Sequence, residues 1–276
     1  MKFIGIGLAL AFGAVQATAQ KISPFSAAFF PQESQLELST GLAHSLSSYT
    51  AHSVLSEHQG DTVALIASPG LRWGVSPNWA LEVIQPIAHR LEVDAFNPNV
   101  GPEGLRAPTV TMAHLLEPSA LFRVKLAGML QVNPWSNTGL NQWGGSVTGI
   151  LTPSDKDAVT LGLAGGVNPS NQQRTTSLSA TWAHSWGPWL TQGAISTTRF
   201  GAFSNNVGHS DTSEVLSTSL ELSREMDPDV WAGLAWSVAR NANHFNVLPT
   251  AQLPMAIVMD NRTLLRTISL TIRVLR

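Results

Sequence analysis

The feature that most constrains the fold is a series of about twelve segments in which apolar and polar residues alternate. Alternation with a period of two is typical of β-strands that have one apolar and one polar face. In the segment 120–132, for example, Phe122 and Leu130 fall on the face opposite Arg123 and Gln131. No stretch stands out with the period of an amphipathic helix. The sequence therefore predicts an all-β chain.

The connections between these segments alternate in length. The five that follow even-numbered strands are short, such as Gly187-Pro188, whereas most of the others are long, such as 48–61 and 242–262. Transmembrane barrels have short periplasmic turns, longer extracellular loops and an even number of strands. The pattern thus predicts a transmembrane antiparallel up-and-down β-barrel of about 12 strands in the bacterial outer membrane. The expected strands are 35–47, 62–73, 79–90, 109–116, 120–132, 142–151, 159–167, 175–186, 189–199, 214–225, 231–241 and 263–275.

Composition and the positions of tryptophan agree with a membrane barrel. Charged residues make up 12% of the chain, about half of the share that is usual in soluble proteins. Tryptophan rings favour the boundary between membrane and water, and several tryptophans border the predicted periplasmic turns. A soluble all-β protein with buried tryptophans is the alternative, because the signal of each single barrel strand is weak. The expected periplasmic aromatic girdle consists of Trp73, Trp79, Trp186, Trp189 and Trp231.

The N-terminus has the three parts of a secretory signal, namely Lys2, an apolar stretch over 3–15 and the small residues Ala17-Thr18-Ala19. Loss of this signal moves the formal net charge from −2 to −3, because Lys2 is its only charged residue. Such a chain has no basic surface for nucleic acid. Three regions are expected: a signal peptide (1–19), a short N-terminal periplasmic or lumen segment (20–34) and the outer-membrane β-barrel (35–276).

The hairpin at residues 70–90 also resembles a known family. Its sequence, GLRWGVSPNWALEVIQPIAHR, is similar to the pattern of strand, glycine, turn, aliphatic strand and proline in the outer-membrane transporter family linked to the MetA pathway of phenol degradation. The first expected strand, LELSTGLAHSLSS, is similar as well. The family's Gly-Asp-rich fourth strand is not visible around 107–116, and the chain ends in Arg276 instead of an aromatic residue. The resemblance implies an outer-membrane channel for small compounds, including hydrophobic or aromatic ones.

Alternation places several charged residues on the lumen face, near the periplasmic ends of the strands. This arrangement has two interpretations. A constriction would select permeants by charge and size, whereas a salt-bridge network would brace or close the lumen, since buried charges need partners. The rest of the predicted lumen face is small and neutral, which favours a narrow pore that is either filled with water or plugged. The expected lumen charge belt consists of Glu37, Glu82, Arg123, Lys125, Glu221 and Arg273.

No pattern in the sequence indicates a catalytic, cofactor or metal site. The histidine spacings do not match those of metal ligands, and in pairs such as His184-Ser185 and His209-Ser210 the two side chains point to opposite faces of a strand. We therefore expect no enzyme activity, no cofactor and no metal. The expected function is passive or substrate-specific diffusion of small molecules across the outer membrane of a Gram-negative bacterium. The expected partners are outer-membrane lipid, a small-molecule permeant and, during insertion, the barrel-assembly machinery. A structural or adhesive barrel with a plugged lumen and no transport is the alternative.

Overall fold

The computed structural model describes residues 23–53, 57–92, 104–133, 139–169, 172–204, 208–247 and 257–276. The predicted signal peptide lies outside the described residues. All regular structure in the described part of the chain is β-strand. In that part, no helix is long and apolar enough to span a membrane.

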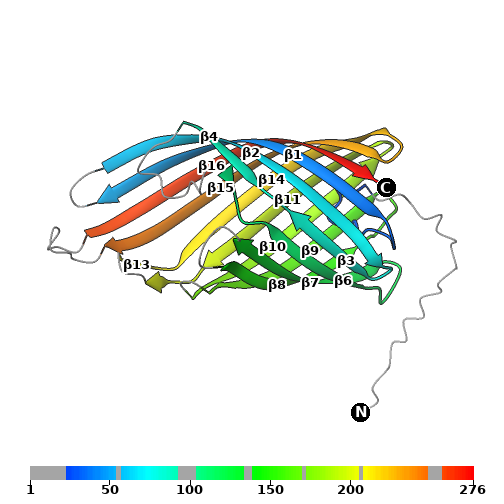
Figure 1. Cartoon of the computed structure of the whole chain (residues 1–276), viewed down its shortest axis with the longest axis horizontal. Coiled ribbons are helices and arrows are strands. Elements are labelled where there is room, and N and C mark those ends of the chain that lie inside the picture. The colour runs from blue at the N-terminus through cyan, green and yellow to red at the C-terminus, as the bar shows by residue number, and fades with distance from the viewer. Residues whose placement is uncertain are drawn as a thin grey trace, which may run out of the picture.

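The strands form one antiparallel sheet. It closes into a barrel because β1 pairs with both β2 and β16 (Figure 1). The barrel has twelve strands, since β3 and β4 together make one strand and β5, β12 and β13 are short additions. The elements are β1 (Leu36–Ser53), β2 (Glu57–Ser76), β3 (Trp79–Ile84), β4 (Ile87–Glu92), β5 (Gly104–Leu105), β6 (Thr109–Leu116), β7 (Phe122–Asn133), β8 (Gly139–Leu151), β9 (Asp157–Asn168), β10 (Gln173–Trp186), β11 (Trp189–Phe200), β12 (Phe203–Ser204), β13 (Gly208–Ser210), β14 (Ser213–Asp227), β15 (Val230–Val247) and β16 (Ile257–Leu275).

The predicted twelve-stranded barrel is confirmed, but two pairs of strands are longer than predicted. β1 extends to Ser53 and β2 begins at Glu57, so most of the expected loop 48–61 is strand. β15 and β16 likewise cover much of the expected loop 242–262. These extensions keep their register, for example Tyr49 opposite Thr263. Their sequence is polar because a strand that projects beyond the lipid no longer needs an apolar outer face, and the alternation therefore ends before the strand does.

The two ends of the barrel differ in their connections. Five connections of two to five residues, β2–β3, β6–β7, β8–β9, β10–β11 and β14–β15, lie at one end, which we call the turn end. The chain enters β1 and leaves β16 at this same end, where Leu36 and Arg276 exchange backbone hydrogen bonds of 2.9 and 2.7 Å. Figure 1 shows this end on the right, beside the C-terminus. The opposite end is called the loop end.

The two faces of the barrel wall differ as the alternation predicts. Large apolar side chains on the outside are exposed, for example Leu161 at 65% and Leu220 at 55%. The inner face carries small side chains, and hydroxyl groups pair across neighbouring strands: Ser177 with Thr198 at 2.7 Å and Ser196 with Ser217 at 2.7 Å. Proteins in water do not leave an apolar band of this extent uncovered, whereas lipid covers it in a membrane barrel.

One glycine in the wall allows neighbouring strands to approach closely. A Cβ on Gly144 of β8 would overlap the carbonyl oxygen of Gly165 on β9. We expect Gly144→Ala to lower the free energy of unfolding by about 1–3 kcal/mol, because the backbone must shift. Urea titration of the refolded barrel measures this loss. Gly128→Ala is the matched control, because a Cβ there would meet nothing within 4 Å; an equal loss in both variants would contradict the explanation.

Candidate functional site in the barrel lumen

Residues 23–34, which precede β1, form a plug across the lumen near the turn end. Phe25 and Ala28 anchor it, and both are buried. The side chains that pack on Phe25 are Ala183 of β10, Leu190 of β11 and Trp231 of β15. Those that pack on Ala28 are Leu115 of β6 and Ile150 of β8. Because these strands belong to different parts of the wall, the plug spans the lumen instead of following one strand.

Three barrel side chains hold the backbone of the plug. The Ala27 N–H donates to Gln192 Oε1 at 2.9 Å. The Ala28 carbonyl accepts from Arg123 Nη2 at 3.1 Å, and the Pro24 carbonyl accepts from Arg273 Nη1 at 2.8 Å. The polar backbone of the plug therefore finds partners on β7, β11 and β16, as buried backbone groups require.

Two wall glycines make room for the plug. A Cβ on Gly233 of β15 would lie 2.5 Å from the Phe25 ring. A Cβ on Gly74 of β2 would overlap the carbonyl of Gln32, at the other end of the plug. The Gly74 carbonyl in addition accepts a hydrogen bond from the Ser34 N–H at 2.8 Å. The wall thus has recesses at both ends of the plug.

Glu37 is the centre of a charge network at the turn end. Its side chain is 3% exposed and its two oxygens accept one hydrogen bond each, from Arg72 and from Arg273, both at 3.0 Å. Arg72 also donates to Glu82 at 2.7 Å. Glu82, Arg72 and Glu37 lie opposite one another on adjacent strands, β3, β2 and β1. The network reaches the plug, because Arg273 also holds the Pro24 carbonyl.

The structure brings three of the six residues of the predicted charge belt, Glu37, Glu82 and Arg273, into this network. Of the other three, Arg123 of β7 donates a hydrogen bond to the plug. Lys125 lines a cavity between the plug and the wall, and Glu221 lies on the inner face of β14. Arg72, which bonds to both Glu37 and Glu82, is missing from the predicted charge belt. Its neighbour Trp73 is 43% exposed on the outer face, so the alternation around Trp73 is the signal that would have placed Arg72 in the lumen.

The predicted aromatic girdle is wrong for Trp231. This side chain is 4% exposed and packs on Phe25 inside the barrel. Its orientation follows from alternation along β15, where Leu234 and Trp236 are exposed on the outside and odd-numbered residues therefore point inward. The other predicted members are exposed near the turn end, and their girdle role stays a prediction: Trp73, Trp79, Trp186 and Trp189.

A cavity of about 340 Å³ lies between the plug and the wall, with phenylalanines of the plug on one side. The guanidinium of Arg273 lies 4.4 Å from the centre of the Phe25 ring, and that of Arg72 lies 5.8 Å from the centre of the Phe29 ring. Such contacts orient cations by the electrostatic attraction of the ring face. The wall contributes polar side chains, such as Ser146 and Thr148 of β8, and small apolar ones. The cavity therefore combines an aromatic surface with fixed positive charge.

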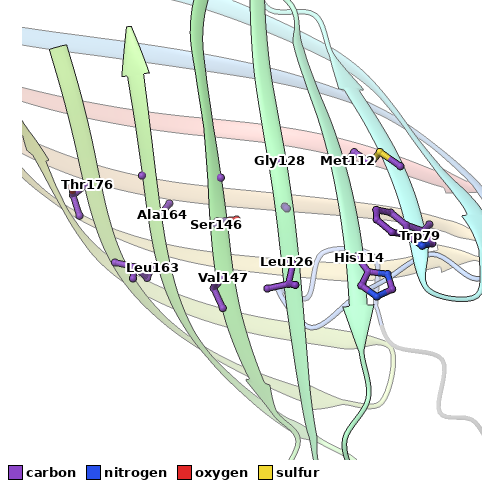
Figure 2. Close-up of a pocket in the computed structure, with 13 residues that line it drawn as sticks. Trp79, Met112, His114, Leu126, Gly128, Ser146, Val147, Leu163, Ala164 and Thr176 are labelled. Carbon is purple, nitrogen blue, oxygen red and sulfur yellow. The ribbon is translucent and has the colours of Figure 1, made fainter. Parts of the chain in front are cut away.

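A second groove, of about 630 Å³, lies on the outside of the barrel, across β3 and β6 to β10 (Figure 2). Leu126, Val147 and Leu163 stand side by side along it on β7, β8 and β9. They share the outer face with Leu161 and are exposed. These three side chains therefore face lipid, whereas Ala127 and Ser146 line both the groove and the cavity beside the plug.

One group of side chains at the loop end resembles a nucleophile with its base. Ser204 Oγ lies 2.7 Å from His209 Nδ1, and His209 Nε2 lies 3.2 Å from Asp211 Oδ1. Ser204 and His209 are not adjacent in the sequence and lie opposite each other on β12 and β13. Pairs of adjacent Ser and His residues therefore do not reveal this contact. All three side chains are exposed to water, which weakens the interactions that activate a nucleophile. Among the described residues, no group of His, Asp or Glu could hold a metal ion.

No protein-family model and no curated protein matches the chain. Solved outer-membrane barrels are similar to it in structure. An outer membrane channel from Pseudomonas putida F1 has a TM-score of 0.52 and 12% identity, over 90% of this chain and 100% of that one. NanC porin has a TM-score of 0.48 and 9% identity, over 79% and 98% of the two chains. KdgM porin has a TM-score of 0.44 and 8% identity, over 83% and 98%. The likeness to the Pseudomonas channel shows the fold of an outer-membrane β-barrel.

Proposed function

We propose that the chain is a diffusion channel of the bacterial outer membrane for small molecules. The observation that carries this proposal is a lumen that water reaches. Ser179, in the middle of β10, lies on the inner face and is exposed. Its neighbours across the strands are Gly162 and Ser196. Small side chains leave space in a twelve-stranded barrel, and hydroxyl groups offer hydrogen bonds to a hydrated permeant.

In this proposal the plug closes the periplasmic end at rest. Three side-chain hydrogen bonds and the packing of Phe25 and Ala28 hold it. Because these contacts are few, they can break and release the plug while the hydrogen bonds between the barrel strands stay intact. We assign two roles to the charge belt, with Arg72 added: it braces the plug, and it sets the charge that a permeant meets at the closed end.

The resemblance to the transporter family of phenol degradation supports small hydrophobic or aromatic permeants. We assign the chain no enzyme activity and no cofactor. Lipid covers the outer apolar band, and we propose that the barrel-assembly machinery inserts the chain. The same plug also favours a second function, a structural or adhesive barrel without transport, if the plug never leaves the lumen.

Conductance in planar lipid bilayers separates these two functions. We expect the refolded wild-type barrel to give discrete single-channel steps, with long closed periods because the plug is in place. The control is the same preparation after heat denaturation, which should give no steps. If neither the wild type nor a variant with a displaced plug conducts, the channel is ruled out and the structural function is favoured.

A further inference from the structure

We propose that the cavity between plug and wall binds small carboxylates with an aromatic body, and that Lys125 holds their carboxylate group. This inference rests on the proposed channel function and names its class of permeant. It starts from the size of the cavity. A cavity of about 150 Å³ is enough to bind benzene. The cavity of about 340 Å³ therefore has room for one ring, a carboxylate and water.

The aromatic part of the ligand follows from the plug. Phe25, Phe29 and Phe30 of the plug all line the cavity. Aromatic rings stack on or meet the edges of such rings with a gain beyond the burial of area. Ala80, Ala113 and Ala127 line the wall and add apolar surface without filling the space.

The negative charge of the ligand follows from the charges around the cavity. Three cationic side chains, Arg72, Lys125 and Arg273, line it together with one acid, Glu82. The two arginines already hold carboxylates, since both bond to Glu37 and Arg72 also bonds to Glu82. Each oxygen of Glu37 already accepts one of these bonds, and neither Glu37 nor Glu221 is among the residues that line the cavity. The lining therefore has an excess of positive charge.

Lys125 is the cation that remains available. In the part of the chain that the structure describes, its ammonium group takes part in no hydrogen bond or ion pair. The side chain projects from β7 into the lumen, between Leu115 on β6 and Thr148 on β8. An ammonium group away from bulk water gains from a carboxylate partner, because a charge-assisted hydrogen bond is about twice as strong as a neutral one. Thr148 adds a hydroxyl group beside it.

The test compares benzoate with benzyl alcohol, which has the same ring and no charge. Calorimetric titration of the folded barrel in detergent micelles measures both affinities. We expect the wild type to bind benzoate about tenfold more tightly than benzyl alcohol, because one charge-assisted hydrogen bond raises affinity by about this factor. Lys125→Met should abolish the preference, and Lys125→Arg should retain it. Lys156→Met is the matched control, because Lys156 lies exposed in the turn between β8 and β9.

Three outcomes would overturn the proposal: equal affinities for the two ligands in the wild type, an unchanged preference in Lys125→Met, or the same loss in Lys156→Met. Heat-modifiable gel mobility shows that each variant has folded. If Lys125→Met does not fold, Lys125→Gln replaces it, because it also removes the charge and should also abolish the preference. The titration needs no passage through the barrel. A barrel that binds benzoate but gives no conductance would therefore contradict the channel function and support the binding site. A barrel that conducts but shows no preference for benzoate would contradict the binding site alone.

Discussion

Replacing Gly233 with valine is expected to open the channel. The new side chain would occupy the space of the Phe25 ring, which lies 2.5 Å from the position of a Cβ on Gly233. Overpacking of this kind costs about 1–3 kcal/mol. Because this cost falls on the plugged state alone, the ratio of open to closed channels should rise by roughly 5–150-fold. Single-channel recording in planar bilayers measures this ratio as the fraction of time spent open.

Two further variants show whether the effect passes through the plug. Gly193→Val is the matched control, since a Cβ on this β11 glycine would meet nothing within 4 Å; its open fraction should equal that of the wild type. Gly74→Val displaces the other end of the plug, at Gln32, and should also open the channel. In a Phe25→Ala background, Gly233→Val should add nothing, because the ring that it displaces is absent. An open fraction that still rises there would mean that Gly233→Val distorts the barrel itself.

The barrel could be predicted from the sequence because lipid imposes a simple rule on each strand. An outward residue must be apolar wherever the strand crosses the membrane. Outward residues such as Leu161 and Leu163 therefore mark their strand without knowledge of its partners. The rule ceases to act outside the lipid, and for that reason the sequence does not show where β1, β2, β15 and β16 end.

The lumen could be predicted only in part, because no local rule governs it. Alternation places Glu37, Glu82 and Arg273 on the inner face, and they do meet there. It cannot show that Arg273 holds the backbone of Pro24, 249 residues away, or that Gln192 holds Ala27, 165 residues away. Contacts between residues so far apart in the chain produce no periodic pattern in the sequence. Trp231 differs in part: alternation with Leu234 and Trp236 places it on the inner face, but its partner Phe25 is evident only in the fold.

Replacing Glu37 with alanine is expected to cause the largest loss of stability of any single change in the network. Arg72 and Arg273 would lose the carboxylate that they share, and both side chains are only 22% exposed. Removal of one partner from a buried ion pair costs about 3–5 kcal/mol, because the remaining charge stays uncompensated. The free energy of unfolding, from guanidinium chloride titration of the barrel in lipid, should fall by this amount. Glu117→Ala in the exposed β6–β7 turn is the control and should change little.

A triple variant separates the loss of charge balance from the loss of packing. In Glu37→Leu with Arg72→Met and Arg273→Met, no charge of the central network remains except Glu82, which is 28% exposed and still reaches water. Replacement of a whole buried ionic network by apolar side chains is often neutral or stabilising, so the triple variant should recover most of the stability that Glu37→Ala loses. Its plug should nevertheless be looser, because a methionine side chain cannot donate the hydrogen bond that Arg273 gives to the Pro24 carbonyl at 2.8 Å. A stable barrel with a raised open fraction would show that the network fastens the plug; a barrel as unstable as Glu37→Ala would show that the arginine side chains act mainly through packing.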